Sequence, residues 1–109
     1  MSERAKVAVS IIAFAADHQP PIIEFLLRDA FGEEWRFHDK EAIVSLDYLD
    51  ENSSYPVDGS LRCTVLKRYV DETGRALVVI DSMFPDSVDS LGEEHVFTVA
   101  DDQVLLETR

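Results

Sequence analysis

The stretch EEWRFHDKEAIVSLDYLD, residues 33–50, joins the two halves of this 109-residue chain, and its conformation decides the fold. Its first part alternates apolar and polar residues around Trp35 and Phe37, which predicts a short strand. Asp39 is a residue type that caps helices. The apolar residues after it recur at helical spacing: Ala42, Ile43, Leu46 and Leu49. The same segment also alternates as a strand would, at Ala42, Val44, Leu46 and Tyr48. We predict a short helix here, with a strand as the competing interpretation.

The residues before this stretch favour helices. Ser2 is a suitable N-cap for a helix that runs through apolar residues to Ala16, although the valines and isoleucines of this run also fit a strand. Pro20 and Pro21 suit the first turn of a second helix, and Gly32 is the glycine expected after its end. The apolar face of this second helix would consist of Ile23, Leu26, Leu27, Ala30 and Phe31.

The residues after this stretch favour a sheet. Residues 61–70 and 76–84 are rich in β-forming side chains, and the turn between them ends in Gly74, where a positive φ is expected. A final hairpin is expected from residues 95–99 and 104–108. The predicted fold class is therefore α+β. The whole chain would be one domain, with N-terminal helices packed on a curved, mostly antiparallel sheet, as a cone or a cystatin-like roll.

Composition and charge narrow the function classes. The chain carries 22 acidic and 10 basic residues, a formal net charge of −12, and 46% of its residues are hydrophobic. This hydrophobic content is enough for a packed core, and no apolar run reaches the ~18–20 residues that a membrane helix requires. A negative charge without a basic stripe disfavours nucleic acid as a partner. The single cysteine, Cys63, favours a buried position and a reducing cytoplasm.

The sequence lacks the common motifs for metals, phosphates and nucleophiles. His18, His38 and His95 show no metal-binding spacing, and neither a Gly-rich phosphate loop nor Gly-x-Ser-x-Gly occurs. We therefore expect no metal and no cofactor. The carboxylates are spread along the whole chain. This pattern indicates a solvated surface or, alternatively, a surface that binds a basic partner, as in small inhibitor and immunity proteins.

Five segments carry a resemblance to a known superfamily. AVSIIAFAAD (8–17) would be a first helix, PPIIEFLLRDAFGEEWRF (20–37) a second helix and first strand, and DKEAIVSLDYL (39–49) a third helix. GRALVVIDSMF (74–84) and HVFTVADDQVLLETR (95–109) would be the central and closing strands. In this order the chain resembles the nuclear-transport-factor-2-like superfamily, the SnoaL-like and ketosteroid-isomerase-like α+β cones. The resemblance implies a concave sheet closed by helices around a mostly apolar pocket, in a group with many different functions.

Asp39 and His95 are the candidate catalytic residues. By strand alternation, Asp39 shares a face with Trp35 and Phe37. The resemblance implies a general base near the end of the first strand, where Asp39 falls, whereas capping of the third helix is its alternative role. His95 shares a face with Phe97 and could donate a hydrogen bond to a developing oxyanion. The alternative for His95 is a place at a sheet edge beside acidic residues.

Six aromatic residues are the candidate ligand-binding set: Phe14, Trp35, Phe37, Tyr48, Tyr69 and Phe97. Phe14 lies on the segment where the isomerase-like branch has a tyrosine, which argues against ketosteroid isomerase chemistry.

Two functions follow as hypotheses, and the sequence does not decide whether the chain is an enzyme. The first is a small domain that binds an apolar small molecule between helices and sheet, with or without proton-transfer chemistry of an isomerase or hydrolase kind. The second is a non-catalytic, acidic partner-binding or inhibitor-type protein. In both cases we expect a homodimer through the sheet, around Val78 and Ile80.

Overall fold

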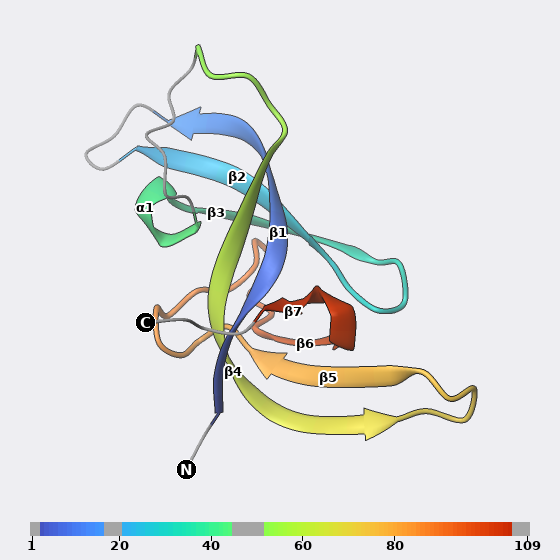
Figure 1. Cartoon of the computed structure of the whole chain (residues 1–109). Coiled ribbons are helices and arrows are strands. Elements are labelled where there is room, and N and C mark those ends of the chain that lie inside the picture. The colour runs from blue at the N-terminus through green and yellow to red at the C-terminus, as the bar shows by residue number, and fades with distance from the viewer. Residues whose placement is uncertain (1–2, 17–20, 45–51, 106–109) are drawn as a thin grey trace.

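The computed structural model describes residues 3–16, 21–44 and 52–105, and in these ranges the chain is almost entirely sheet. The elements in chain order are β1 (Glu3–Ala16), β2 (Ile22–Arg28), β3 (Glu34–Lys40), α1 (Glu41–Val44), β4 (Val57–Val70), β5 (Ala76–Asp81), β6 (Val96–Ala100), the 3₁₀ turn η1 (Asp101–Gln103) and β7 (Val104–Leu105). The strands form one antiparallel sheet in the order β3-β2-β1-β4-β5-β6, and β7 pairs with β1 (Figure 1).

Both halves of the sheet are built on the long strand β1 (Figure 1). Residues 3–11 of β1 pair with β4, and residues 10–16 pair with β2. Lys6 and Val7 pair with β7, which continues along the edge that β2 leaves open. The β1–β2 ladder contains two register shifts, and such irregularities bend and twist a strand. The sheet consequently curls into an antiparallel half-barrel.

The predicted α+β class with N-terminal helices is wrong. The two runs predicted as helices contain β1 and β2, and their burial has the two-residue period of a strand. The buried residues of these strands are Ala5, Val7, Val9 and Ile11 in β1, and Ile23, Phe25 and Leu27 in β2. Leu26 and Phe31 were both expected on a buried helical face, but Leu26 is half-buried and Phe31 is exposed. The first run is rich in β-branched residues and pairs with β4. The second run pairs with the first, and this pairing outweighs the helical spacing that residues 22–31 show by coincidence.

The other predicted elements are confirmed in part. A helix begins at Glu41, as predicted, and α1 is four residues long. The strand predictions around residues 61–70 and 76–84 agree with β4 and β5. The predicted final hairpin is wrong, because η1 turns the chain and β7 pairs with β1 instead of β6. Several residues used in the predictions lie outside the described residues: Ser2, Pro20, Leu46, Tyr48 and Leu49.

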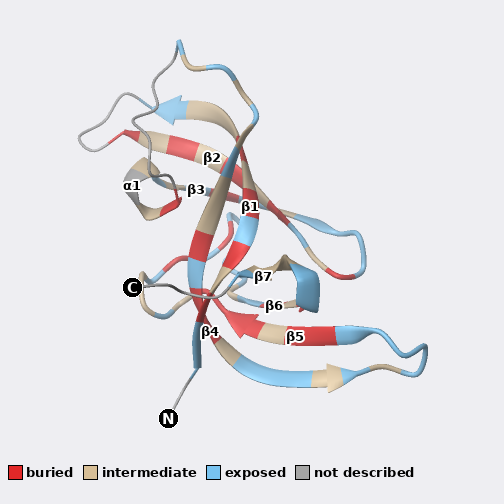
Figure 2. Cartoon of the chain, in the orientation of Figure 1, coloured by how far each residue is buried: buried red, intermediate tan, exposed pale blue. Residues whose placement is uncertain are grey.

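The curl brings the two edge strands, β3 and β6, together around a core of aromatic rings. Phe37 stacks on Phe25 with ring centroids 4.8 Å apart, and its other neighbour is Phe97 at 5.7 Å. Trp35 lies 5.3 Å from Phe97. Figure 2 shows buried positions in β1, β2, β4 and β5, where intermediate or exposed positions separate many of them. These rings occupy the inside of the curl.

Two backbone hydrogen bonds join the edges of the curl. The N–H of Ala30, in the β2–β3 turn, donates to the carbonyl of Thr98 on β6 at 2.9 Å. The N–H of Leu91, in the loop before β6, donates to the carbonyl of Arg36 on β3 at 2.8 Å. Edge strands are sites of unwanted pairing, and these two contacts cover part of both edges.

Helix α1 packs on β4 at a position where only glycine fits. A Cβ atom added at Gly59 would lie 2.7 Å from the carbonyl oxygen of Val44 and 2.9 Å from Cδ1 of Ile11. Real Cβ atoms do not approach backbone oxygens so closely. Gly59 therefore allows the last residue of α1 to lie directly against the sheet.

We expect Gly59→Ala to lower the free energy of unfolding by about 1–3 kcal/mol, because the added methyl group overpacks the contact between α1 and β4. Urea denaturation measures the change. Gly92→Ala is the matched control, since an added Cβ there has its nearest neighbour at 3.8 Å. Equal effects of the two substitutions would contradict the close packing of α1 on β4.

Candidate functional site

The structure brings three of the predicted site residues together in the core. Trp35 and Phe37 both pack on Phe97, and Trp35 Nε1 donates a hydrogen bond to Asp29 Oδ2 at 2.9 Å. Phe14 lies half-buried on β1 opposite Ile23. Tyr69 lies half-buried on β4, where the ammonium of Lys67 is 5.2 Å from the centre of its ring.

The two predicted catalytic residues have separate partners. Asp39 shares the inward face of β3 with Phe37, whereas His38 is exposed, as strand alternation predicts. The Oδ1 atom of Asp39 accepts the N–H of Lys40 at 2.8 Å. His95 Nδ1 lies 2.8 Å from Oδ1 of Asp81, a pairing that the sequence reasoning missed. The sequence signal was an aspartate that ends the apolar run of β5.

The pair of His95 and Asp81 holds a loop in place. Asp81 also accepts the N–H of Met83 at 2.9 Å, and its side chain is only 12% exposed. The hydroxyl of the next residue, Ser82, donates to the carbonyl of Val88 at 2.7 Å. This hydroxyl is therefore used to close the loop and is not oriented toward the imidazole as a nucleophile would be. The arrangement fixes the chain between β5 and β6.

Three turns in the structure have the same construction. They are Asp29–Glu33, Asp71–Arg75 and Ser90–Glu94, five residues each. In each turn the first side-chain oxygen accepts the N–H groups of the third and fifth residues: Asp29 from Phe31 and Glu33, Asp71 from Thr73 and Arg75, and Ser90 from Gly92 and Glu94. The first N–H also donates to the fifth carbonyl, and the fourth N–H to the first carbonyl. Each turn is thus rigid without help from distant residues.

The third turn departs from the other two at its fourth position. Gly32 and Gly74 occupy this position in the first two turns, both with a φ of +85°. Glu93 occupies it in the third, with a φ of +67°. A side chain in this left-handed region costs about 1–2 kcal/mol relative to glycine. Such strain is commonly found where a side chain is kept for function.

We define the acidic loop as residues 89–94, which contain the third turn. Asp89, Glu93 and Glu94 are exposed, and Leu91 is 56% exposed between them. The hydroxyl of Ser90 is buried beneath these residues and holds their backbone. The loop therefore presents three carboxylates and one apolar side chain in a fixed arrangement.

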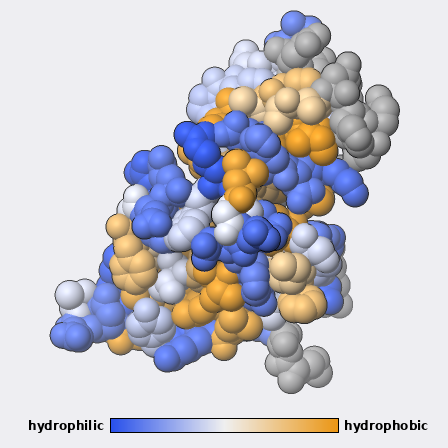
Figure 3. Space-filling view, turned by 180° about the vertical axis from the view of Figure 1, so that it is seen from behind, coloured by the Kyte–Doolittle hydropathy of each residue, from blue (hydrophilic) through white to orange (hydrophobic). Residues whose placement is uncertain are grey.

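Elsewhere on the described surface, several arginines are paired with carboxylates. Four of the arginines form salt bridges with carboxylates: Arg28 with Glu34, Arg36 with Glu24, Arg62 with Asp86, and Arg68 with Glu3 and Asp101. The hydrogen bond from Arg68 holds the pKa of Glu3 below its usual value, and Glu3 in turn raises the pKa of Arg68. From behind, the surface is mostly hydrophilic, with hydrophobic side chains in separate areas (Figure 3).

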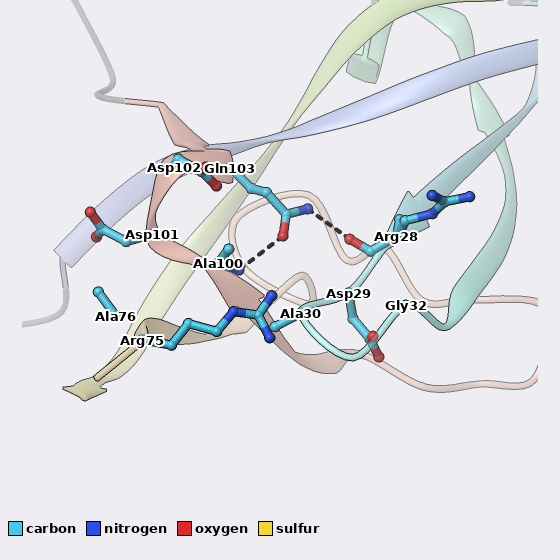
Figure 4. Close-up of a pocket in the computed structure, with 10 residues that line it drawn as sticks. All are labelled: Arg28, Asp29, Ala30, Gly32, Arg75, Ala76, Ala100, Asp101, Asp102 and Gln103. Carbon is cyan, nitrogen blue, oxygen red and sulfur yellow. Dashed lines mark hydrogen bonds between the residues drawn. The ribbon is translucent and has the colours of Figure 1, made fainter. Parts of the chain in front are cut away.

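Besides the acidic loop, the structure has an open groove between the β2–β3 turn, the start of β5 and η1. The volume of this groove is about 640 Å³. We call it the Arg75 groove. Its lining residues, drawn in Figure 4, are Arg28, Asp29, Ala30, Gly32, Arg75, Ala76, Ala100, Asp101, Asp102 and Gln103. The amide of Gln103 spans it: Oε1 accepts the N–H of Ala100 at 2.9 Å, and Nε2 donates to the carbonyl of Arg28 at 2.7 Å.

Within the described residues, no group of three or more His, Cys, Asp or Glu side chains is arranged to hold a metal ion. None of the helices in the described part of the chain is long and apolar enough to cross a membrane. Comparisons with protein-family models, with curated proteins and with solved structures find no match to this chain. The resemblance to the nuclear-transport-factor-2-like superfamily stays a sequence-based prediction, and the first two helices on which it rests are strands β1 and β2.

The turn that carries Arg75 gives a pH prediction. The hydroxyl of Thr73 and the backbone N–H of Arg75 lower the pKa of Asp71 by donating hydrogen bonds to its carboxylate. A carboxyl whose pKa is lowered in the folded state stabilises it above the unfolded pKa, about 3.9 for Asp, and this contribution is lost as the pH falls through the folded pKa. We expect a carboxyl-detected NMR titration to give Asp71 a pKa below 3.9.

Thr73→Ala serves as the check, because it removes the hydroxyl that contributes most to this shift. The pKa of Asp71 should then move back toward the usual value. A pKa of Asp71 that is ordinary in the natural chain and unchanged in Thr73→Ala would show that the turn does not form as described.

Proposed function

We propose that this chain is a non-catalytic binding protein whose acidic loop receives a positively charged segment of a protein partner. The observation that carries the proposal is Glu93, which keeps a carboxylate at a position where the two equivalent turns have glycine. A residue that costs stability at an exposed position needs a reason other than folding. Presentation of charge to a partner supplies that reason.

Charge and exposure support a basic partner. Asp89, Glu93 and Glu94 form no salt bridge with any residue that the structure describes, so a partner's lysines or arginines would meet uncompensated carboxylates. The overall charge of −12 would attract such a partner from a distance and speed its association. Leu91 adds an exposed apolar contact within the same loop. Basic segments that also carry an apolar side chain fit this combination.

The packed core supports a non-catalytic function. The rings of Phe25, Phe37 and Phe97 occupy the inside of the curl, and His95 and Asp39 are each bonded to protein groups. Binding of an apolar small molecule, with or without chemistry, stays a prediction from the sequence, and so does location in the cytoplasm. A homodimer also stays a prediction. It would require residues other than Val78 and Ile80, which are 1% and 0% exposed in the core.

A peptide-binding experiment tests the acidic loop. The probe is a fluorescein-labelled peptide of alternating lysine and leucine, and binding is followed by fluorescence anisotropy at two salt concentrations. We expect binding that weakens as salt rises, because screening reduces attraction between exposed charges. Peptides of alternating glutamate and leucine, or of lysine and serine, should bind more weakly.

Two triple variants with the same change in charge locate the binding surface. Asp89→Asn/Glu93→Gln/Glu94→Gln should weaken binding of the lysine–leucine peptide about tenfold, which corresponds to about 1.4 kcal/mol. The matched control, Glu33→Gln/Asp58→Asn/Glu72→Gln, removes three charges from exposed positions elsewhere and should have a smaller effect. Equal weakening in the two variants would show that the overall charge, and not the acidic loop, binds the peptide.

Glu93→Gly separates stability from binding. Glycine relieves the left-handed conformation, so the free energy of unfolding should rise by about 0.5–1 kcal/mol. The same substitution should weaken binding of the lysine–leucine peptide. Glu94→Gly is the control, because Glu94 is not among the residues with positive φ and glycine there should lower stability. A Glu93→Gly variant that is less stable than the natural chain would remove the structural argument for the acidic loop.

A further inference from the structure

The Arg75 groove contains two charged side chains of opposite sign that the fold leaves uncompensated. Arg75 forms no salt bridge with any residue that the structure describes, and its side chain extends along the groove toward Ala30 (Figure 4). The other arginine of the groove, Arg28, is bonded to Glu34 at 2.7 Å. Asp102 is exposed and makes no hydrogen bond or salt bridge to the described part of the chain. The groove therefore offers one free guanidinium and one free carboxylate.

The remaining carboxylates of the groove are already in use. Asp101 bonds to Arg68 at 3.2 Å. Asp29 accepts the N–H groups of Phe31 and Glu33 and the indole N–H of Trp35, so both of its oxygens are bonded to protein groups. A ligand would meet these two residues as parts of the wall and Arg75 and Asp102 as free binding groups.

The groove is open because small residues line it, and its walls are fixed. Ala30, Gly32, Ala76 and Ala100 have no side chain long enough to fill it, and an added Cβ at Gly32 would meet nothing within 4 Å. Gln103 Oε1 accepts the N–H of Ala100 just before η1, and its Nε2 ties η1 to the end of β2 by donating to the carbonyl of Arg28. Arg75 is the last residue of the rigid turn that begins at Asp71, and its backbone N–H is bonded to the Asp71 carboxylate. A site held in this way loses little conformational entropy when a ligand binds.

The two free groups define the chemistry of the ligand. A guanidinium binds a carboxylate through two parallel hydrogen bonds, and a carboxylate binds an ammonium. A ligand with negative charge alone would be repelled by a protein of net charge −12. A ligand with both charges has no net repulsion to overcome. We propose that the Arg75 groove binds a zwitterion of the amino-acid class, with its carboxylate on Arg75 and its amine on Asp102.

This chemistry has two sources, a free basic amino acid and the C-terminal lysine of a peptide. The proposal concerns a different surface from the acidic loop and does not depend on the function proposed for that loop. The probes are L-lysine, L-lysinamide, which lacks the carboxylate, and hexanoate, which lacks both amines. An acetylated glycyl-lysine peptide represents the chain end.

The test is an NMR titration of the ¹⁵N-labelled chain that follows the Nε–H signal of Arg75 and the backbone signals of Gly32 and Ala100. L-lysine should shift these signals saturably, whereas L-lysinamide and hexanoate should bind at least about tenfold more weakly. A stronger response to the peptide than to L-lysine would identify the chain end as the source, and the reverse would identify the free amino acid. Signals that do not move with L-lysine or with the peptide would overturn the proposal.

Matched variants assign the two roles. Arg75→Gln removes the guanidinium and keeps the backbone N–H that bonds Asp71, and it should abolish saturable binding. Arg4→Gln makes the same change at an exposed arginine of β1 outside the groove, and binding should be unchanged. Asp102→Asn should weaken the binding of L-lysine, and Asp58→Asn is its control. If Arg75→Gln and Arg4→Gln weakened the binding of L-lysine equally, binding would depend on the overall charge of the protein, and the groove would not be the site.

Discussion

The packing of Phe37, which stacks on Phe25 and meets Phe97 edge-on, is the contact on which the rest of the structure depends. Phe25 and Phe37 come from the half of the sheet before α1, and Phe97 comes from the half after it. The edges of these halves are joined by two backbone hydrogen bonds, from Ala30 to Thr98 and from Leu91 to Arg36. Each buried aromatic side chain removes about 150–250 Å² from water. Burial of the rings and these two hydrogen bonds together hold the curled sheet closed.

A core that is filled in this way moves the candidate binding features to the turns and edges. The three five-residue turns are held by a side-chain oxygen of Asp29, Asp71 or Ser90, each of which bonds the backbone of its own turn. Two of them line or support the Arg75 groove, and the third forms the acidic loop. Local hydrogen bonds can fix a surface in place without a large domain behind it. A chain of this size can thus hold parts of its surface in a fixed conformation despite its small core.

Each of the two proposals rests on a residue that the fold alone does not explain. Glu93 keeps a side chain where glycine would be more stable, and Arg75 keeps a free guanidinium in a chain whose other groove arginine is salt-bridged. The pair of Asp81 and His95 looks chemically suggestive in isolation. Its neighbours show that it closes a loop, because the N–H of Met83 donates to the Asp81 carboxylate and the hydroxyl of Ser82 donates to the carbonyl of Val88.

The sequence by itself determined the local features whose cause lies within a few residues. It placed β4, β5, the alternation of Trp35, Phe37 and Asp39, and a helix start after Asp39, because each depends on neighbouring side chains. It also identified a turn glycine with positive φ at Gly74. Gly32 shows the limit: a glycine with positive φ fits the end of a helix and the turn of a hairpin equally well.

Only the tertiary structure decided the fold class and the candidate sites. The runs of β1 and β2 satisfy helical and strand patterns together, and β1 became a strand because β4, more than 40 positions later, pairs with it. The pairing of Asp81 with His95, the groove around Arg75 and the shared geometry of the three turns likewise join residues that are distant in the chain or differ in sequence. The periodicity of one segment carries no information on the free energy of these long-range contacts. For that reason it could not distinguish a helix from a strand in these runs.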